Sequence, residues 1–129
     1  MAGSTSIRPS ENSHDWLGHG AYFWESDLER ARRWAREHAD DPFVVGAVIG
    51  LGRCLDLTSG DSSCILKPYY ELLAQTNASQ GTPMPRNSVK GDGGEWIKRD
   101  LDCAVIEFLH QARAADGLRD CSRRLLRRW

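Results

Sequence analysis

The sequence predicts an α+β domain, because segments with helical periodicity alternate with segments of β-branched and aromatic residues. Residues 26–39 and 102–115 each carry an apolar stripe at helical spacing together with signals for helix ends. Between them, residues 43–51 form a nearly unbroken apolar run with three valines, which is typical of an interior strand. The chain has 129 residues, the length of one domain.

Three regions follow from composition. Residues 1–15 are rich in Ser, Asn and Gly, and they predict an irregular lead-in. Residues 16–117 predict the folded domain, and residues 118–129 form a basic, Arg-rich tail.

The domain is expected to open with a short strand and a helix. Residues 22–24 are consecutive aromatic residues, which favour a strand. Ser26 and Glu29 have the spacing of a capping box, in which Ser26 accepts a hydrogen bond from the backbone N–H of Glu29 and the Glu29 side chain reaches back. Pro42 is expected to stop the helix.

The second half predicts a strand, a helix and a loop before the last helix. Residues 53–57 alternate in polarity like a short strand. Asp61 is a candidate N-cap of a further helix, whose regular part is expected to begin near Pro68. Residues 76–94 hold four glycines and two prolines, so we expect a long loop there. Gly117 is the expected C-terminal cap of the last helix.

Composition also restricts the function classes. No apolar run approaches the ~20 residues of a membrane span, and the N-terminal residues lack a signal region, so we expect a cytoplasmic protein without a membrane span. The four cysteines are Cys54, Cys64, Cys103 and Cys121. They form no C-x-x-C pair, so we expect buried or idle thiols. His14, Asp15 and His19 match no familiar spacing of metal ligands, so no metal site is expected.

The net charge of -1 conceals an asymmetry, because residues 118–129 carry +4 and the rest of the chain carries -5. In the tail, Leu118, Leu125, Leu126 and Trp129 have near-helical spacing. A basic amphipathic helix can contact nucleic acid, an acidic partner or a membrane surface. A merely solvating end explains the same residues, so both interpretations stay open.

The strongest chemical signal is the run of residues 17–23, Leu-Gly-His-Gly-Ala-Tyr-Phe. Glycine allows a backbone to approach a ligand closely, and an aromatic ring over a cation contributes about 0.5–2 kcal/mol. Taken alone, the run is better explained as an ordinary strand of core aromatic residues flanked by glycines.

This segment resembles the ADP-ribosyltransferase superfamily, to which poly(ADP-ribose) polymerases and diphtheria-toxin-like enzymes belong, and in particular a bacterial and phage group of toxin-like transferases. The motif G-x-G-x-Y-F at residues 18–23, the apolar residues 45–52 and the Asp-Cys-Ala-Val-Ile at residues 102–106 carry the resemblance, which covers roughly residues 8–117. The resemblance implies a small split β-sheet flanked by helices. It also implies that NAD is the substrate and that ADP-ribose is transferred to an unknown macromolecular acceptor, either a protein or a nucleic acid.

The resemblance further assigns roles to the motif. Tyr22 would stack on the nicotinamide and is the catalytic candidate. Gly18 and Gly20 would let the backbone approach NAD, and Phe23 would back the strand. His19 would lie near the ligand, where it hydrogen-bonds a ribose hydroxyl or nothing at all.

Two parts that the superfamily usually supplies are not found in the sequence. An upstream His or Arg is missing, and residues 2–4, Ala-Gly-Ser, are at best a remnant of a His-Gly-Ser/Thr motif. The late Glu is missing too, because no Glu follows Glu107. Glu95 and Glu107 are candidate substitutes, and both are expected to be solvated surface acids. The resemblance therefore predicts an incomplete fold with an altered or truncated C-terminus. The alternative to an active transferase is a catalytically dead derivative or fragment that binds a protein or a nucleic acid.

Overall fold

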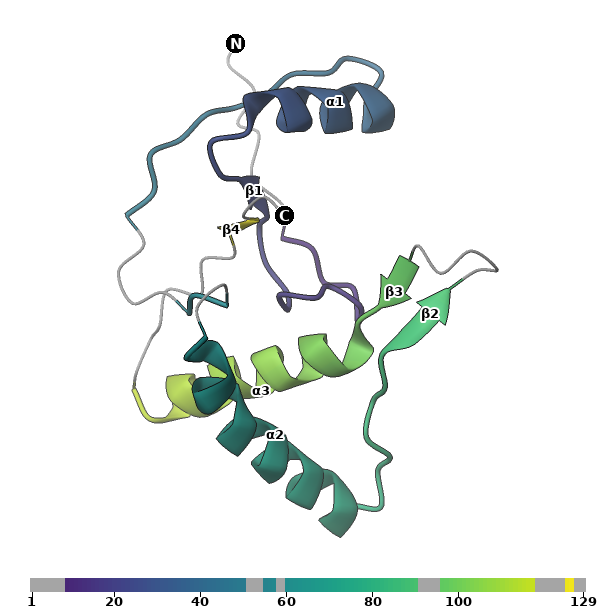
Figure 1. Cartoon of the computed structure of the whole chain (residues 1–129), viewed down its shortest axis with the longest axis vertical. Coiled ribbons are helices and arrows are strands. Elements are labelled where there is room, and N and C mark those ends of the chain that lie inside the picture. Colours follow the sequence, from purple (N-terminus) through teal and green to yellow (C-terminus); the bar gives the residue numbers. More distant parts are fainter. Residues whose placement is uncertain (1–8, 51–54, 58–59, 91–95, 118–124, 127–129) are drawn as a thin grey trace.

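The computed structural model describes five stretches of the chain: residues 9–50, 55–57, 60–90, 96–117 and 125–126. These residues form three helices and two two-stranded sheets, in the order β1, α1, α2, β2, β3, α3 and β4. The predicted α+β class is therefore confirmed. Helix α1 lies at one end of the molecule, α2 and α3 lie at the other, and β1 and β4 lie between them (Figure 1). Among the described residues, no helix is long and apolar enough to cross a membrane.

Helix α1 spans Leu28–His38 and confirms the first predicted helix, but its cap differs from the prediction. Asp27 is the N-cap, and its Oδ1 accepts a hydrogen bond of 3.1 Å from the backbone N–H of Arg30. Ser26 lies outside the helix with a φ of 53°, and Glu29 forms an ion pair within the helix. The capping-box prediction is wrong, because the short carboxylate one residue later reaches the free N–H groups of the first turn.

The apolar segment after α1 is not a strand. Residues 43–50 have no regular secondary structure and run along one side of the molecule (Figure 1). The exposed fractions of Phe43, Val45 and Val48 are 68%, 72% and 105%. The prediction of an interior strand is wrong for these residues, because β1 pairs with β4 and no described strand lies beside the segment to share its backbone hydrogen bonds. Residues 55–57 likewise form no strand.

Helices α2 (Ser62–Ser79) and α3 (Asp100–Ala115) pack against each other and hold most of the described core. The apolar stripe predicted for residues 102–115 consists of Val105, Phe108, Leu109 and Ala112. Val105 and Leu109 are buried, whereas Phe108 and Ala112 are half-buried. Gly117 follows α3 with a φ of 73° and donates its N–H to the Ala114 carbonyl at 3.2 Å, as expected for a glycine that ends a helix. The buried apolar side chains of the two helices are Leu73, Cys103, Val105, Ile106 and Leu109.

Helix α2 is longer than predicted at both ends. It begins after the N-cap Asp61, so that Pro68 lies inside the helix and not at its start. It also runs four residues into the predicted loop at 76–94. The same loop contains β2 (Ser88–Lys90), which pairs antiparallel with β3 (Trp96–Lys98). The favourable packing of α2 against α3 outweighs the free-energy cost of a proline inside the helix, so local helix propensity alone does not decide where α2 begins.

Strand β1 (Phe23–Trp24) confirms the predicted strand at residues 22–24, although it is short. It pairs in parallel with β4 (Leu125–Leu126), and Phe23 is the partner of Leu125. The near-helical spacing of the tail is therefore misleading at these two residues, because backbone pairing with β1 makes them a strand. The tail's remaining residues lie outside the described part of the chain.

Candidate functional site

The glycine motif lies in a compact loop between the lead-in and β1. Ser10 and Gly20 exchange two backbone hydrogen bonds of 2.9 Å, which close the loop. Inside it, the Asn12 N–H donates to the Asp15 carboxylate at 2.9 Å, and the Gly18 N–H donates to the Asp15 carbonyl at 2.7 Å. The loop is thus held by its own backbone and by one aspartate.

Both motif glycines adopt backbone conformations that other residues rarely reach. The φ angles of Gly18 and Gly20 are 76° and 148°, and a Cβ atom is disfavoured in that region. Gly18 is also buried. These positive φ angles are by themselves sufficient to require glycine at both positions.

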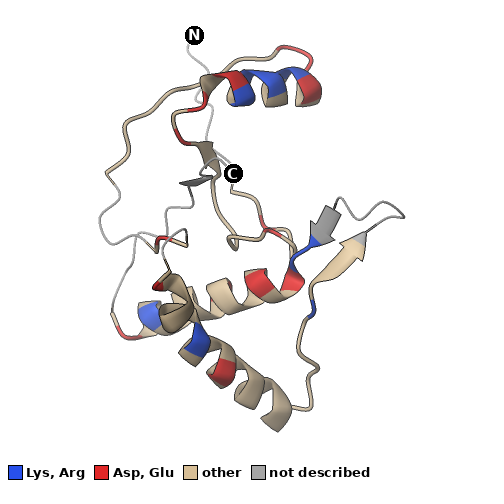
Figure 2. Cartoon of the chain, in the orientation of Figure 1, with Lys and Arg blue, Asp and Glu red and all other residues tan. Residues whose placement is uncertain are grey.

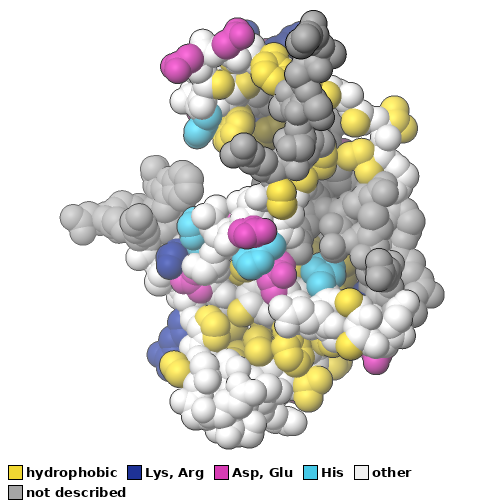
Figure 3. Space-filling model, turned by 180° about the vertical axis from the view of Figure 1, so that it is seen from behind, with side chains coloured by type: hydrophobic (Ala, Val, Ile, Leu, Met, Phe, Trp, Pro, Cys, Tyr) yellow, Lys and Arg dark blue, Asp and Glu magenta, His cyan; other side chains and the backbone are white. Residues whose placement is uncertain are grey.

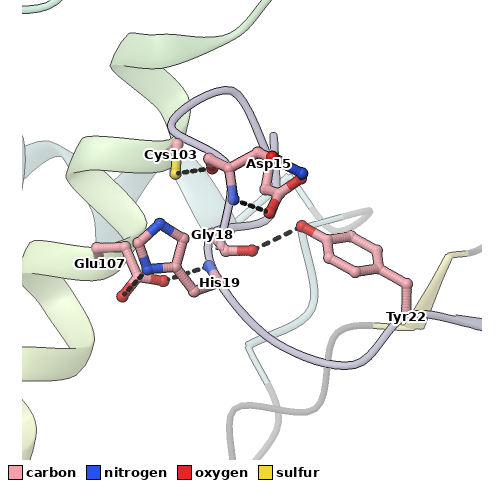
Figure 4. Close-up of polar contacts among 7 residues, drawn as sticks. Asp15, Gly18, His19, Tyr22, Cys103 and Glu107 are labelled. Carbon is pink, nitrogen blue, oxygen red and sulfur yellow. Dashed lines mark hydrogen bonds and ion pairs between the residues drawn. The ribbon is translucent and has the colours of Figure 1, made fainter. Parts of the chain in front are cut away.

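His19, between the two glycines, is fastened to α3 by Glu107. The His19 N–H donates to Glu107 Oε1 at 2.5 Å, and the ring Nδ1 lies 3.7 Å from Glu107 Oε2 (Figure 4). Only 21% of the Glu107 side chain is exposed. The prediction of a solvated surface acid is therefore wrong for Glu107, because the loop folds over this part of α3. Glu95 lies outside the described residues.

The Tyr22 side chain turns back toward the same loop. Its hydroxyl donates a hydrogen bond of 2.6 Å to the Gly18 carbonyl (Figure 4). The ring is half-buried, and it also lines the wall of a neighbouring groove. The hydrogen bond to the Gly18 carbonyl and the partial burial of the ring together fix the orientation of the Tyr22 side chain.

This groove, which we call the β1–α1 groove, has a volume of about 700 Å³ and lies between β1, the start of α1 and residues 43–49. The volume is within the range of small-molecule sites. Hydrophobic side chains gather around α1 in the upper part of the molecule (Figure 3). The aromatic side chains that line the groove are Tyr22, Phe23, Trp24, Trp34 and Phe43.

The charged side chains that line the β1–α1 groove are carboxylates. Glu25 and Asp27 belong to the lining, and no Lys or Arg is among the described residues that form it. Asp27 is partly committed, because one of its oxygens caps α1. The groove therefore combines an aromatic wall with negative charge, a combination that favours a flat, positively charged ligand.

Two contacts fix the tryptophans at the edge of this groove. The Arg30 guanidinium lies 4.8 Å from the centre of the Trp24 ring. Trp34 stacks on His38 with ring centres 4.4 Å apart and an angle of 13° between the planes. Both rings are thereby held by neighbours on α1.

The five predicted site residues fall into two adjoining groups. Tyr22 and Phe23 line the groove, whereas Gly18, His19 and Gly20 lie in the loop and are absent from its lining. The hydrogen bond from Tyr22 to Gly18 joins the two groups. Sequence reasoning missed the groove residues Trp24, Glu25, Asp27 and Trp34. Trp24, Glu25 and Asp27 could have been included because they follow the aromatic run directly in the sequence. Trp34 could have been included because of its spacing along α1.

Metal and thiol chemistry find little support in the described residues. Within them, no group of three or more His, Cys, Asp or Glu side chains is arranged to hold a metal ion. Cys64 is exposed and Cys103 is buried, and both are free thiols. Cys103 donates a weak hydrogen bond to the Asn12 carbonyl at 3.7 Å. Cys54 and Cys121 lie outside the described residues.

Comparison of this chain with known proteins finds no matching family model, no matching curated protein and no matching solved structure.

Proposed function

We propose that this chain is an NAD-binding domain of the ADP-ribosyltransferase type, whose β1–α1 groove receives the nicotinamide end of NAD. One observation carries the proposal. Tyr22, which the sequence motif assigns to nicotinamide stacking, lines a groove of ligand size. The split sheet and the transfer of ADP-ribose to a macromolecule are parts of the same proposal, and both rest on the sequence resemblance.

The groove is chemically suited to nicotinamide. The nicotinamide ring of NAD is flat and positively charged, so it gains contact area and a cation–π attraction on the Tyr22 face, worth about 0.5–2 kcal/mol. Glu25 and Asp27 add an attractive negative potential. Arg30, held over Trp24 beside the groove, is a cation available for the diphosphate of NAD.

The transfer breaks the bond between nicotinamide nitrogen and ribose, and positive charge develops on the ribosyl carbon as nicotinamide leaves. A fixed carboxylate nearby stabilises that charge. We assign this role to Glu25, which lines the groove next to the aromatic residues of β1. Glu107 is assigned a positioning role, because its contacts are to His19 in the glycine loop.

NAD binding and nicotinamide release test the proposal separately. We expect Tyr22→Ala to weaken NAD binding by about tenfold, since it removes the stacking ring, as measured by isothermal titration calorimetry. Tyr22→Phe keeps the ring and should stay within about threefold of the unmodified chain. The matched control is Tyr70→Ala, the same substitution on α2, which does not line the groove.

Turnover is measured as nicotinamide released, with chromatographic detection. We expect Glu25→Gln to lower the rate by about 100-fold and to leave the dissociation constant for NAD nearly unchanged. Saturable NAD binding without nicotinamide release identifies a non-catalytic binding module. Absence of saturable NAD binding overturns the proposal, and equal binding by Tyr22→Ala overturns the groove assignment.

The acceptor of ADP-ribose is predicted only as a macromolecule, either a protein or a nucleic acid. Contact of nucleic acid with the Arg-rich tail also stays a prediction, because residues 118–124 and 127–129 lie outside the described part of the chain.

A further inference from the structure

A second cavity lies between α2 and α3, built from different residues than the β1–α1 groove. This α2–α3 cavity has a volume of about 470 Å³. Leu66, Val105 and Ile106 provide aliphatic walls, and Trp16 and Tyr70 add aromatic faces. Val105 and Ile106 are buried core residues, so part of the cavity wall is formed by the core of α3. Hydrophobic side chains gather in this lower region of the molecule (Figure 3).

Two cations, Lys67 and Arg99, belong to the lining of this apolar cavity. Lys67 is 77% exposed, and its Nζ lies 4.0 Å from a Glu71 carboxylate oxygen. The Arg99 guanidinium lies 5.4 Å from the centre of the Trp16 ring, which holds it against the aromatic wall. The Arg99 guanidinium is thus held in place by Trp16, whereas the exposed Lys67 side chain can adjust its position.

The one carboxylate in the described lining, Asp102, is already engaged. Its Oδ1 accepts a hydrogen bond from Asn87 Nδ2 at 2.8 Å, and its Oδ2 accepts from Arg99 Nη1 at 2.9 Å. Nη1 is the only Arg99 nitrogen that donates a hydrogen bond to another described residue. The charged lining residues are two cations, Lys67 and Arg99, and one carboxylate, Asp102, so the lining has a net positive charge. The remaining N–H donors of the guanidinium and the Lys67 ammonium can bind an anion.

We propose that the α2–α3 cavity binds a small amphipathic carboxylate, with its hydrocarbon body against Leu66, Val105 and Ile106 and its carboxylate at Arg99 and Lys67. An apolar body removes the exposed parts of Leu66, Trp16 and Tyr70 from water. A carboxylate head can accept two parallel hydrogen bonds from the guanidinium and is attracted by its charge, whereas an alcohol head lacks both the second acceptor oxygen and the charge. A cationic head is repelled by the same two residues.

Affinity should rise with hydrocarbon length while the cavity fills. A buried methylene contributes about fourfold in affinity at most. We therefore expect decanoate to bind more than tenfold more tightly than hexanoate. Decan-1-ol, with the same chain and no charge, should bind at least about tenfold more weakly than decanoate.

The experiment is a calorimetric titration of the whole chain with decanoate and with decan-1-ol. Arg99→Met keeps an apolar stem and removes the charge, so we expect about tenfold weaker binding of decanoate and unchanged binding of decan-1-ol. The matched control is Lys98→Met. Lys98 is the neighbouring cation, pairs with Asp100 at 3.2 Å and does not line the cavity.

A second variant protects the test from a folding defect, since Arg99→Met also removes the hydrogen bond to Asp102. Lys67→Met, at an exposed position of α2, should weaken decanoate binding severalfold and leave the circular dichroism spectrum unchanged. Equal binding of decanoate and decan-1-ol overturns the proposal. Absence of saturable decanoate binding below its micelle concentration overturns it as well, and so does indifference to both substitutions. NAD titrations are run in parallel, and their outcome is independent because the two cavities share no lining residue.

Discussion

The two ends of the molecule use similar apolar residues in opposite ways. In the α2–α3 pair, Cys103, Val105, Ile106 and Leu109 of α3 are buried, and Leu109 has an exposed fraction of 0%. In α1, only Ala35 is buried, and the exposed fractions of Leu28 and Trp34 are 50% and 52%. We therefore expect burial on α3 to contribute more to the stability of the described fold than burial on α1, where apolar side chains remain exposed.

The segment after α1 sharpens this contrast. Helix α1 carries many charged side chains, whereas residues 42–50 carry none (Figure 2). Such a run normally becomes an interior strand, yet residues 43–47 and Ile49 form a wall of the β1–α1 groove. Exposed apolar surface of this kind commonly marks a binding site, and the candidate NAD groove is found there.

The largest expected effect is at the α2–α3 end. Leu109→Ala should lower the free energy of unfolding by about 2–5 kcal/mol, because it leaves a cavity in the core. Val48→Ala, at the other end, should change it by less than about 0.5 kcal/mol, since Val48 is fully exposed. Urea denaturation followed by circular dichroism measures both. Similar losses for the two variants would show that residues 43–50 are packed and that the contrast is wrong.

A smaller effect is expected at the start of α1. Asp27→Ala should cost about 1 kcal/mol of unfolding free energy, because it removes the hydrogen bond to the Arg30 N–H. Ser26→Ala is the control, and its effect should stay below about 0.5 kcal/mol, since Ser26 lies outside the cap. The same denaturation assay applies. A larger loss for Ser26→Ala restores the capping-box interpretation.

The smallest effect concerns Asp100, at the start of α3. Partial desolvation raises the pKa of Asp100, but the hydrogen bonds from Lys98 and Ser13 and the charges of Lys98 and His14 outweigh it, so the net pKa lies below its ordinary value of 3.8. The contribution of Asp100 to stability is therefore present above that ordinary pKa, and it is lost as the pH falls through the lower, native value.

This pH dependence is measured as the difference in unfolding free energy between the unmodified chain and Asp100→Asn, from about pH 6 down to about pH 3. We expect the difference to shrink as the pH falls. Asp41→Asn is the control, because Asp41 is exposed and makes no ion pair with another described residue. A difference for Asp100→Asn that does not vary with pH contradicts the assignment.

Much of the local structure could be predicted from the sequence, because helices are encoded by neighbouring residues. The apolar stripe of α3, the glycine after it and the aromatic strand at β1 are all found where the sequence predicts them. The turn at Gly18 and Gly20 was also predictable, because glycine is the residue that tolerates positive φ.

Apart from the capping box, where the neighbouring residue Asp27 caps α1 instead, the main errors concern contacts between distant parts of the chain. The spacing of residues 43–51 predicts a strand, but a strand needs a partner, and no local pattern shows that β1 pairs with β4 instead. The sequence predicts a surface acid at Glu107, but in the structure the loop around His19 folds over α3 and contacts Glu107. The interior position of Pro68 is likewise decided by packing of α2 on α3.

For this chain, the sequence by itself determined where the helices lie, which residues turn the backbone and which aromatic residue stands beside the turn. Those features depend on interactions within a few residues, whose energies do not require the rest of the fold. Only the tertiary structure decided which strand pairs with which, that Tyr22 lines a groove with Glu25, and that Arg99 meets Trp16 at a second cavity. These contacts join residues far apart in the chain or orient side chains toward a shared space, and they form only when the whole chain has chosen one arrangement.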